Sequence, residues 1–284
     1  AGWHQIQALP QDFEVPDDYV VPDKANRDAL VEDLLGSEKV IVLAGSPGSG
    51  KSTFLSHLAG HLTQQGVPVI RHHYHMAARE RAGDRFTHTV VLEDLMAQLL
   101  RHHAALLGGE ANKNPTLREF GTWLESAGRS AQERGGALVV IIDGLDHVWR
   151  EQSSATELQR LFERLLPPPN GVRVLIGTQP LSDEQLPPNL LRHAPRASWR
   201  SVPPLDEFAI REVLDFNRAR LRWFDGDPAA RPLPDEAAPA FLRLTNGHPL
   251  HLRYSLEELI NRQHLPVSET IRDLPSCPDG GIGD

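Results

Sequence analysis

Residues Gly45 to Thr53 combine glycines, a lysine and hydroxyl side chains at a spacing suited to binding phosphate groups. They read GSPGSGKST and match the pattern G-x-x-x-x-G-K-[ST] at every fixed position. Glycines let the backbone curl so that successive N–H groups point at phosphate oxygens, and the N-terminus of a following helix adds partial positive charge. We expect Lys51 to hold the β- and γ-phosphates of a nucleotide and the Ser52 hydroxyl to bind Mg²⁺. The predicted phosphate-binding residues are Gly45, Ser46, Pro47, Gly48, Ser49, Gly50, Lys51, Ser52 and Thr53.

Two carboxylates follow an apolar run further along the chain. The run Leu138–Ile142 ends in Asp143, and Asp146 comes three residues later. A carboxylate at the carboxyl end of a parallel strand can reach a metal ion beside a phosphate loop. We therefore expect Asp143 to bind Mg²⁺, and Asp146 to orient an attacking water or extend the metal shell. The alternative is that both are turn residues around Gly144.

The elements that must position these residues follow from the periodicity of apolar side chains. Short β-branched runs predict buried strands, and runs with helical spacing lie between them. Such alternation indicates an α/β fold with a three-layer arrangement, in which a parallel sheet has helices on both faces. Ser154 and Glu157 have the spacing of a capping box at a helix start. The predicted strands are Lys39–Ala44, Val67–Tyr74, Ala137–Ile142, Val172–Gly177 and Ala197–Val202.

The pattern changes after Pro203 and Pro204, where only helical spacing continues. Asp206 is placed to cap the first of these helices. We expect residues 1–202 to form a nucleotide-binding domain and residues 203–268 a small all-α domain. Residues 269–284, rich in Gly and Pro, are expected to be a flexible tail or linker.

The composition of the chain argues against several kinds of binding partner and indicates a cellular compartment. With 29 Lys and Arg against 38 Asp and Glu, the net charge is −9, which argues against a general nucleic-acid surface. The single cysteine cannot form an internal disulfide, which favours a reducing compartment and thus a cytoplasmic protein. The longest purely apolar run, Ala137–Ile142, is far shorter than the ~20 residues that span a bilayer, so we expect no membrane partner.

Two clusters of basic side chains could each have either a functional role, in binding a metal ion or a phosphate, or a purely structural one. His72, His73 and His75 suggest metal binding, but no cysteine or second histidine pair has the spacing of a zinc site, which favours polar side chains near a nucleotide. Seven arginines between positions 192 and 222 form either a solvated or inter-domain face, or a source of one charge for a γ-phosphate. The candidates for that role are Arg192, Arg196 and Arg200.

Four segments of the chain resemble the STAND class of P-loop ATPases, the signalling switches that include the NACHT and NB-ARC modules. These are the loop GSPGSGKST, then VVIIDGLDH, then VRVLIGTQ, and the tetrapeptide Gly247–Leu250 with the sequence GHPL. The resemblance implies a P-loop NTPase fold followed by a helical lid, with ATP or ADP as the ligand. It also implies that Val20–Pro22 closes over the adenine, with Val21 in contact with the base, and that Pro249 approaches the base from the helical domain.

The resemblance further implies how such a module works. STAND proteins hold ADP in a closed monomer and exchange it for ATP on receiving a signal, and they then open into a homo-oligomer. Effector and sensor domains are expected outside this chain, which starts at Ala1 and not at Met. His147 stands where many members have Glu, and Gln179 where they have a sensor Arg, so we expect slow hydrolysis, with Gln179 hydrogen-bonded to the γ-phosphate.

The leading hypothesis is therefore an ATP/ADP-binding switch, a slow ATPase, of a bacterial signalling or immune-sensor protein. Its catalytic residues are predicted to be Lys51, Asp143, Asp146 and Gln179. One alternative is a P-loop kinase of a small molecule or nucleotide, with the helical part as a lid over the acceptor. Another is a DNA-associated ATPase related to AAA+ proteins, which the net charge of −9 disfavours.

Overall fold

The structure, a computed structural model, describes residues 9, 11, 13, 15–74, 85–109, 116–221, 235–261, 271 and 274–277. These residues divide into two compact units. The first contains Leu30–Ala44 and Leu55–Ser201 together with the described residues before position 14. The second combines Val15–Ala29 and Gly45–Phe54 with the chain from Val202 onward. The phosphate-binding loop is thus grouped with the C-terminal helices.

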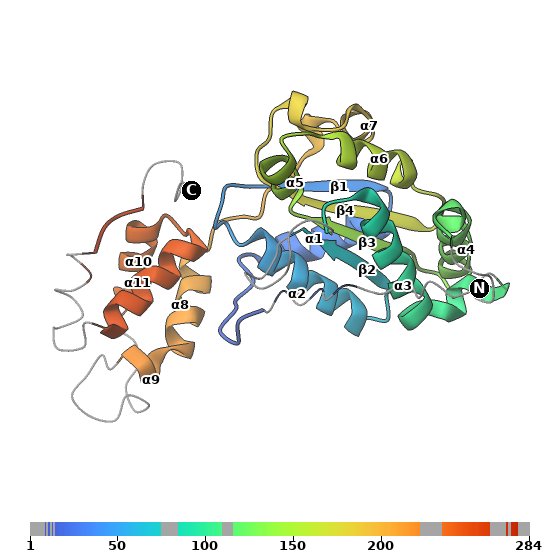
Figure 1. Cartoon of the computed structure of the whole chain (residues 1–284). Coiled ribbons are helices and arrows are strands. Elements are labelled where there is room, and N and C mark those ends of the chain that lie inside the picture. The colour runs from blue at the N-terminus through green and yellow to red at the C-terminus, as the bar shows by residue number, and fades with distance from the viewer. Residues whose placement is uncertain are drawn as a thin grey trace. The chain divides into compact units, whose positions relative to one another are not determined.

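A four-stranded parallel sheet forms the centre of the first unit, in the order β1-β4-β3-β2 (Figure 1). Strand β4 lies between β1 and β3, and because the three strands are parallel their carboxyl ends lie at the same edge of the sheet. The predicted parallel sheet is confirmed. The strands are β1 (Val40–Ala44), β2 (Val69–His73), β3 (Leu138–Asp143) and β4 (Val172–Thr178).

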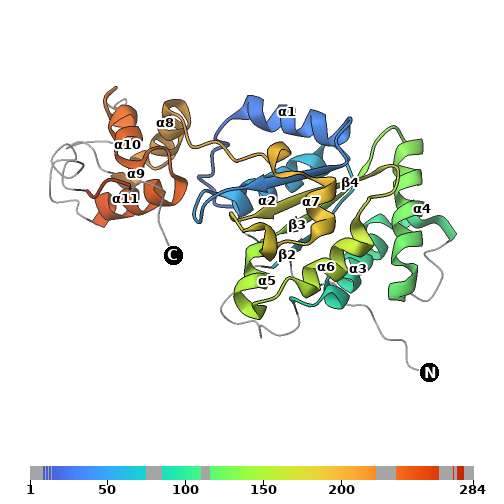
Figure 2. The ribbon, with the colours of Figure 1, turned by 90° about the horizontal axis from the view of Figure 1, so that it is seen from above.

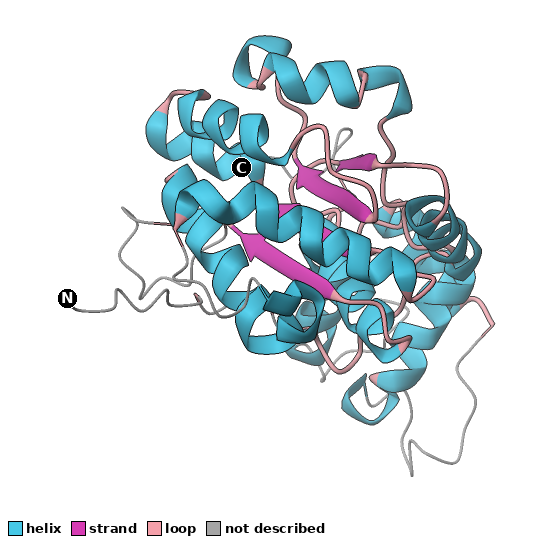
Figure 3. Ribbon diagram, turned by 90° about the vertical axis from the view of Figure 1, so that its right-hand side faces the viewer, coloured by secondary structure: helices cyan, strands magenta, loops and turns pink. Residues whose placement is uncertain are grey.

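Helices cover both faces of this sheet, as Figures 2 and 3 show. One set of alternate strand residues, including Val42, Val140 and Ile176, belongs to a core shared with α3, α4 and α6. The intervening residues Ile41 and Ile141 are also buried, which explains why the strands are continuous apolar runs. Helices outside the C-terminal part are α1 (Lys24–Leu35), α2 (Lys51–Gln64), α3 (His88–Leu107), α4 (Phe120–Glu133), α5 (Leu145–Gln152), α6 (Thr156–Leu165) and α7 (Pro188–His193), with 3-10 turns η2 (Leu117–Glu119), η3 (Asp183–Gln185) and η4 (Arg196–Ser198).

The C-terminal part is helical in every described residue that has regular structure. Asp206 caps its first helix by accepting a hydrogen bond from the Ala209 N–H at 2.7 Å, as predicted. A separate apolar core of this unit centres on the fully buried Phe241. Its helices are α8 (Glu207–Phe216), α9 (Arg218–Leu221), α10 (Ala237–Thr245) and α11 (Pro249–Asn261).

Two local predictions are wrong. Ala197–Val202 is not a strand: residues 196–198 form a 3-10 turn, and Arg200 alone bridges to Leu43 of β1. Pro203 and Pro204 lack the N–H groups that a longer ladder needs. The capping box is absent as well, because α6 begins at Thr156 and Glu157 instead accepts hydrogen bonds from His88 N (2.8 Å) and Nδ1 (2.7 Å). None of the helices in the described residues is long and apolar enough to cross a membrane.

Two glycines of α4 differ in how closely they pack against neighbouring residues, and substituting them tests the packing of this helix on the sheet. A Cβ placed on Gly128 would overlap the Asn170 carbonyl and lie 2.8 Å from Val172 Cγ2, whereas one placed on Gly121 meets nothing within 4 Å. We expect Gly128→Ala to lower the free energy of unfolding by about 1–3 kcal/mol. Gly121→Ala, in the same helix, should raise it by about 0.5–1 kcal/mol, since alanine is the better helix former. Urea denaturation followed by circular dichroism measures both, and equal midpoints for the two variants would contradict the packing described.

Candidate functional site

The phosphate-binding loop connects β1 directly to α2. Its chain reverses through Gly48 and Gly50, whose φ values of +71° and +82° are rarely adopted by residues with a Cβ. The first intrahelical hydrogen bond, from Phe54 N to the Gly50 carbonyl, is 2.8 Å long. The N-terminus of α2 thus follows the glycine turns of the loop directly, and helix N-termini bind anions through the N–H groups of their first turn.

The Lys51 ammonium is held at this loop by three oxygen acceptors. Its Nζ donates to the carbonyls of Gly45 (2.6 Å) and Ser46 (3.0 Å), with Ser49 Oγ at 3.4 Å. The residue is only 8% exposed. A buried ammonium surrounded by neutral oxygen atoms needs no large movement to exchange them for phosphate oxygens, which are stronger acceptors. Ser52 and Thr53, in the first turn of α2, remain partly exposed.

The GHPL segment lies against the same loop, and both belong to the second unit. A Cβ placed on Gly48 would come within 2.7 Å of Leu250 Cδ2 and 2.9 Å of His248 Cε1. Pro249 Cγ is 3.5 Å from the corresponding position on Gly50. The structure therefore brings Pro249, predicted to contact the base, beside the phosphate loop. Its contact with a base stays a prediction, as does that of Val21, which is buried at 7% exposure.

Asp143 is held at the end of β3 by a histidine from β2. Its Oδ2 lies 3.0 Å from His73 Nδ1, and His73 Nε2 lies 3.4 Å from Ser56 Oγ of α2. Asp143 and His73 are 2% and 3% exposed. With Nδ1–H donating to the carboxylate, Nε2 is left to accept from the serine hydroxyl. The carboxylate is thereby fixed in direction from a neighbouring strand, and nothing in the sequence indicated this role for His73 beyond its histidine-rich setting.

Gly177 is a second residue that the sequence did not single out. It pairs with Leu43 of β1 on one side and with Asp143 of β3 on the other. A Cβ at this position would collide with Asp143 Oδ1 and lie 2.5 Å from Leu55 Cδ1. The space beside the carboxylate thus depends on glycine here. The available signal was a glycine interrupting a β-branched run, which often marks a close approach of another group.

Asp146 and Gln179, predicted separately, are neighbours in the structure. Asp146 Oδ1 accepts from the Gln179 backbone N–H at 3.1 Å. Arg150, which sequence analysis missed, donates to Gln179 Oε1 at 2.6 Å and lies 3.5 Å from Asp146 Oδ2. His147 Nε2 is 3.9 Å from the same oxygen. Asp146 is 3% exposed, and its carboxylate connects the end of β4 to α5 through these contacts.

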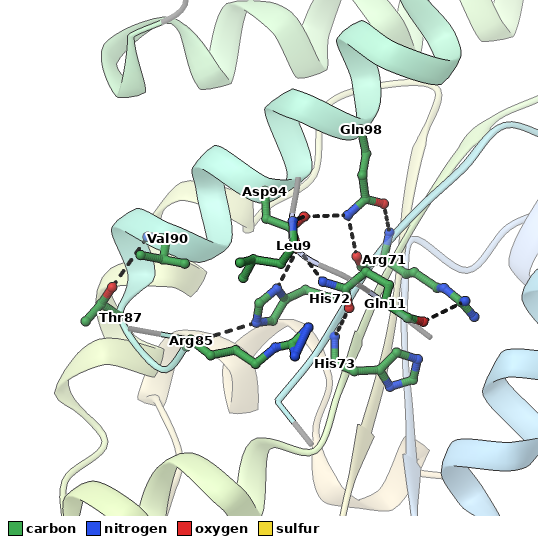
Figure 4. A network of polar contacts seen from close by, with 10 residues as sticks. All are labelled: Leu9, Gln11, Arg71, His72, His73, Arg85, Thr87, Val90, Asp94 and Gln98. Carbon is green, nitrogen blue, oxygen red and sulfur yellow. Dashed lines mark hydrogen bonds and ion pairs between the residues drawn. The ribbon is translucent and has the colours of Figure 1, made fainter. Parts of the chain in front are cut away.

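The other histidine of β2 faces a different carboxylate, in the network drawn in Figure 4. His72 Nδ1 is 2.8 Å from Asp94 Oδ2, and neither side chain is exposed. Asp94 also accepts from Leu9 N (2.9 Å), Gln11 Nε2 (2.6 Å) and Gln98 Nε2 (3.0 Å). Burial lowers the pKa of His72, so the ring is neutral at pH 7 and donates from Nδ1.

Gln11 joins this network to the Asp143 side of β2. Its backbone carbonyl accepts from Arg71 Nη2 at 2.8 Å and its Oε1 from His73 N at 2.7 Å. Phe13 stacks on the His73 ring with centroids 5.6 Å apart. His72 and His73 are thus engaged by carboxylates on opposite sides of the strand, and His75 lies outside the described residues. No group of three His, Cys, Asp or Glu residues in the described parts of the chain could hold a metal ion.

The arginine-rich segment is mostly neutralised by acidic partners. Arg196 Nε donates to Asp183 at 2.9 Å, and Arg200 Nη1 lies 2.7 Å from Asp33. We call the described residues from Val202 onward the helical unit. In it, arginines pair with acids: Arg211 with Asp235, Arg218 with Asp215 and Arg220 with Glu257. This is the behaviour of a solvated or inter-domain face. Arg222 lies outside the described residues.

The solved structures that resemble this chain include an ATPase and replication proteins, all with low sequence identity. The Walker-type ATPase paby2304 of Pyrococcus abyssi has a TM-score of 0.56 and 15% identity, over 94% of this chain and 75% of that chain. Domain III of the replication initiation protein DnaA from Thermotoga maritima has a TM-score of 0.48 and 16% identity, over 94% and 98%. Cdc6p from Pyrobaculum aerophilum has a TM-score of 0.47 and 13% identity, over 89% and 64%.

A search of curated proteins finds no significant match. The likeness to the Pyrococcus ATPase concerns the fold alone, and it agrees with the parallel sheet described above. The family model of the AAA ATPase domain matches residues 27–176, more than half of the chain, from α1 through the phosphate loop and Asp143 to β4. With the loop, the lysine and the carboxylate in their expected elements, this chain belongs to the AAA ATPase domain family.

Proposed function

We propose that this chain is a nucleotide-controlled switch of the STAND kind, which binds ATP and ADP, hydrolyses ATP slowly and self-associates when ATP is bound. The observation that carries the proposal is the contact between the GHPL segment and the phosphate loop, with Pro249 beside Gly50 and His248 beside Gly48. A loop that touches both its ligand and the helical part of the chain can transmit the state of the nucleotide. Family membership supports the binding of ATP or ADP.

Each residue of the site has a proposed role. The loop N–H groups and Lys51 hold the phosphates, while Val21 and Pro249 contact the adenine. The Ser52 hydroxyl and the Asp143 carboxylate would hold Mg²⁺, because both supply the hard oxygen ligands this ion prefers, with phosphate oxygens and waters completing its shell. The ion would neutralise charge on the phosphates. The carboxylate fits this role, since it is 2% exposed and its orientation is fixed by His73.

Slow hydrolysis is supported by the surroundings of Asp146. Its Oδ1 already accepts from Gln179 N, and Arg150 competes for both Oδ2 and the Gln179 side chain. These contacts occupy the carboxylate oxygens, which leaves less of the carboxylate to orient an attacking water. We propose that the contacts of Arg150 with Asp146 and Gln179 must break before Asp146 can orient the water and Gln179 can reach the γ-phosphate. Rapid turnover is disfavoured, which suits a switch.

The proposed architecture assigns residues 1–202 to the nucleotide-binding domain, 203–268 to a helical lid and 269–284 to a linker. Sensor and effector domains would be carried elsewhere in a longer, cytoplasmic protein. A second candidate, a DNA-associated ATPase of the AAA+ type, is favoured by family membership. The net charge of −9 opposes it, and it predicts DNA binding that weakens steeply with salt.

Removing the loop ammonium tests nucleotide binding directly. We expect Lys51→Ala to weaken binding of ATP and ADP by about 100-fold or more, because charge-assisted hydrogen bonds to two phosphates are lost. Calorimetric titration of both nucleotides measures the change. The matched control is Lys39→Ala, which removes an exposed lysine that bonds Asn170 just before β1. Equal affinities for the wild type and Lys51→Ala would refute the site.

The metal role of Asp143 predicts a different pattern. Asp143→Asn should leave nucleotide binding without Mg²⁺ nearly unchanged, but should remove its enhancement by Mg²⁺ and lower the turnover rate by about 100-fold, since metal stabilisation of charge is worth several kcal/mol. Asp183→Asn, at an exposed carboxylate paired with Arg196, is the control. Phosphate release and titrations with and without the metal separate the two variants, and Mg²⁺-dependent turnover that survives in Asp143→Asn excludes this carboxylate.

Two measurements taken together, self-association and DNA binding, separate the two candidate functions. We expect the chain to be monomeric with ADP and to form a larger species with a non-hydrolysable ATP analogue, as measured by light scattering coupled to size exclusion. The Lys51→Ala variant should stay monomeric in both. Unchanged mass, together with DNA binding that falls by about 10³-fold or more between low and moderate salt, would favour the DNA-associated ATPase instead.

A further inference from the structure

The turn before α11 presents His248 to the phosphate loop in a fixed position. Asn246 and Gly247 both have positive φ, at +49° and +70°. The Gly247 carbonyl accepts from Leu205 N at 2.8 Å, and a Cβ on Gly247 would collide with the Leu205 carbonyl. His248 N donates to the Thr245 carbonyl at 2.9 Å. The backbone of His248 is therefore anchored to the start of the helical unit.

The His248 ring has one tautomer that satisfies both of its neighbours. The backbone N–H of His251 points at Nδ1 over 3.3 Å, so Nδ1 accepts and the ring proton resides on Nε2. Nε2 lies 3.2 Å from the carbonyl oxygen of Pro47, to which it donates. Burial lowers the pKa of His248, which keeps the ring neutral at pH 7.

This hydrogen bond constrains the peptide between Pro47 and Gly48. In a trans peptide the C=O and N–H groups point in opposite directions, so an oxygen held toward His248 turns the Gly48 N–H away from it. The same contact keeps the carbonyl dipole from facing an anion in the loop. Gly48 itself has φ +71°, and Leu250 Cβ would lie 2.9 Å from a Cβ built on it, so this peptide is confined from two directions.

We propose that His248 is a positioning residue for the nucleotide phosphates, which holds the Pro47 carbonyl outward so that the Gly48 N–H faces the phosphates. The inference rests on the proposed nucleotide site and deepens it. It assigns the helical unit a part in phosphate binding that is independent of any contact between Pro249 and a base. It also identifies a hydrogen bond through which the loop and the helical unit influence each other.

The test uses substitutions that keep or remove the donor at the Nε2 position. His248→Gln places an amide N–H near that position, His248→Asn carries the same amide on a stem too short to reach Pro47, and His248→Leu has no donor. We expect the Asn and Leu variants to bind both MgATP and MgADP about 5- to 10-fold more weakly, and the Gln variant to stay within about twofold of the wild type, in line with the net value of one hydrogen bond. His251→Leu, which loses a bond to the Pro275 carbonyl but keeps the backbone N–H, should bind normally.

Hydrogen exchange in the loop peptide 45–53 provides a readout that does not need nucleotide. It should accelerate in the Asn and Leu variants and not in the Gln variant, at unchanged melting temperature. If the Asn and Leu variants both bind nucleotide with wild-type affinity, the role of His248 is overturned. It is also overturned if the Gln variant binds nucleotide as weakly as the Asn and Leu variants. A wild-type chain that binds neither nucleotide overturns the proposed function, whereas Lys51→Ala losing affinity while His248→Asn retains it overturns this inference alone.

Discussion

Gly177 lies in register between Leu43 of β1 and Asp143 of β3, and the arrangement of the sheet edge depends on this row of three residues. One residue after Leu43 the chain leaves β1 for the phosphate loop, and at Asp143 β3 ends in a buried carboxylate. Parallel pairing sets both carboxyl ends at one level. The glycine then leaves room for the carboxylate, which any side chain at position 177 would displace.

Three carboxylates buried in the first unit, those of Asp94, Asp143 and Asp146, each lie beside a donor. His73 contacts Asp143, His72 contacts Asp94, and the exposed Arg150 lies 3.5 Å from Asp146 Oδ2. An ionised carboxylate removed from water without donors would cost several kcal/mol, and these donors offset that cost. The same pairs restrict the direction of each carboxylate. If Asp143 binds Mg²⁺ as we propose, this restriction would hold its oxygen ligand in a reproducible position.

The GHPL segment connects the phosphate loop to the C-terminal helices through direct contacts. His248 and Leu250 contact the loop at Gly48, and the His248 ring is hydrogen-bonded to the Pro47 carbonyl. Lys51 Nζ donates to the Gly45 carbonyl of the same loop. Under the proposed function, a nucleotide that draws Lys51 toward its phosphates would change the contacts of Gly45 and Ser46, which are one or two residues from the peptide that His248 contacts. This is the route by which we propose that exchange of ADP for ATP affects the C-terminal helices.

Local patterns in the sequence were enough to predict the parallel α/β fold, the loop with Lys51, the strand ending in Asp143 and the cap at Asp206. These features follow from local spacing and from side-chain types that act within one turn or one strand. The partners of the polar side chains could not be predicted in this way, because they depend on the tertiary structure. Glu157 bonds His88 across two helices and forms no cap, Arg200 makes a lone bridge to β1, and His73 orients Asp143 from seventy residues away. Packing in three dimensions brings each donor to its acceptor. The number of residues between the two in the sequence does not predict which residues will pair.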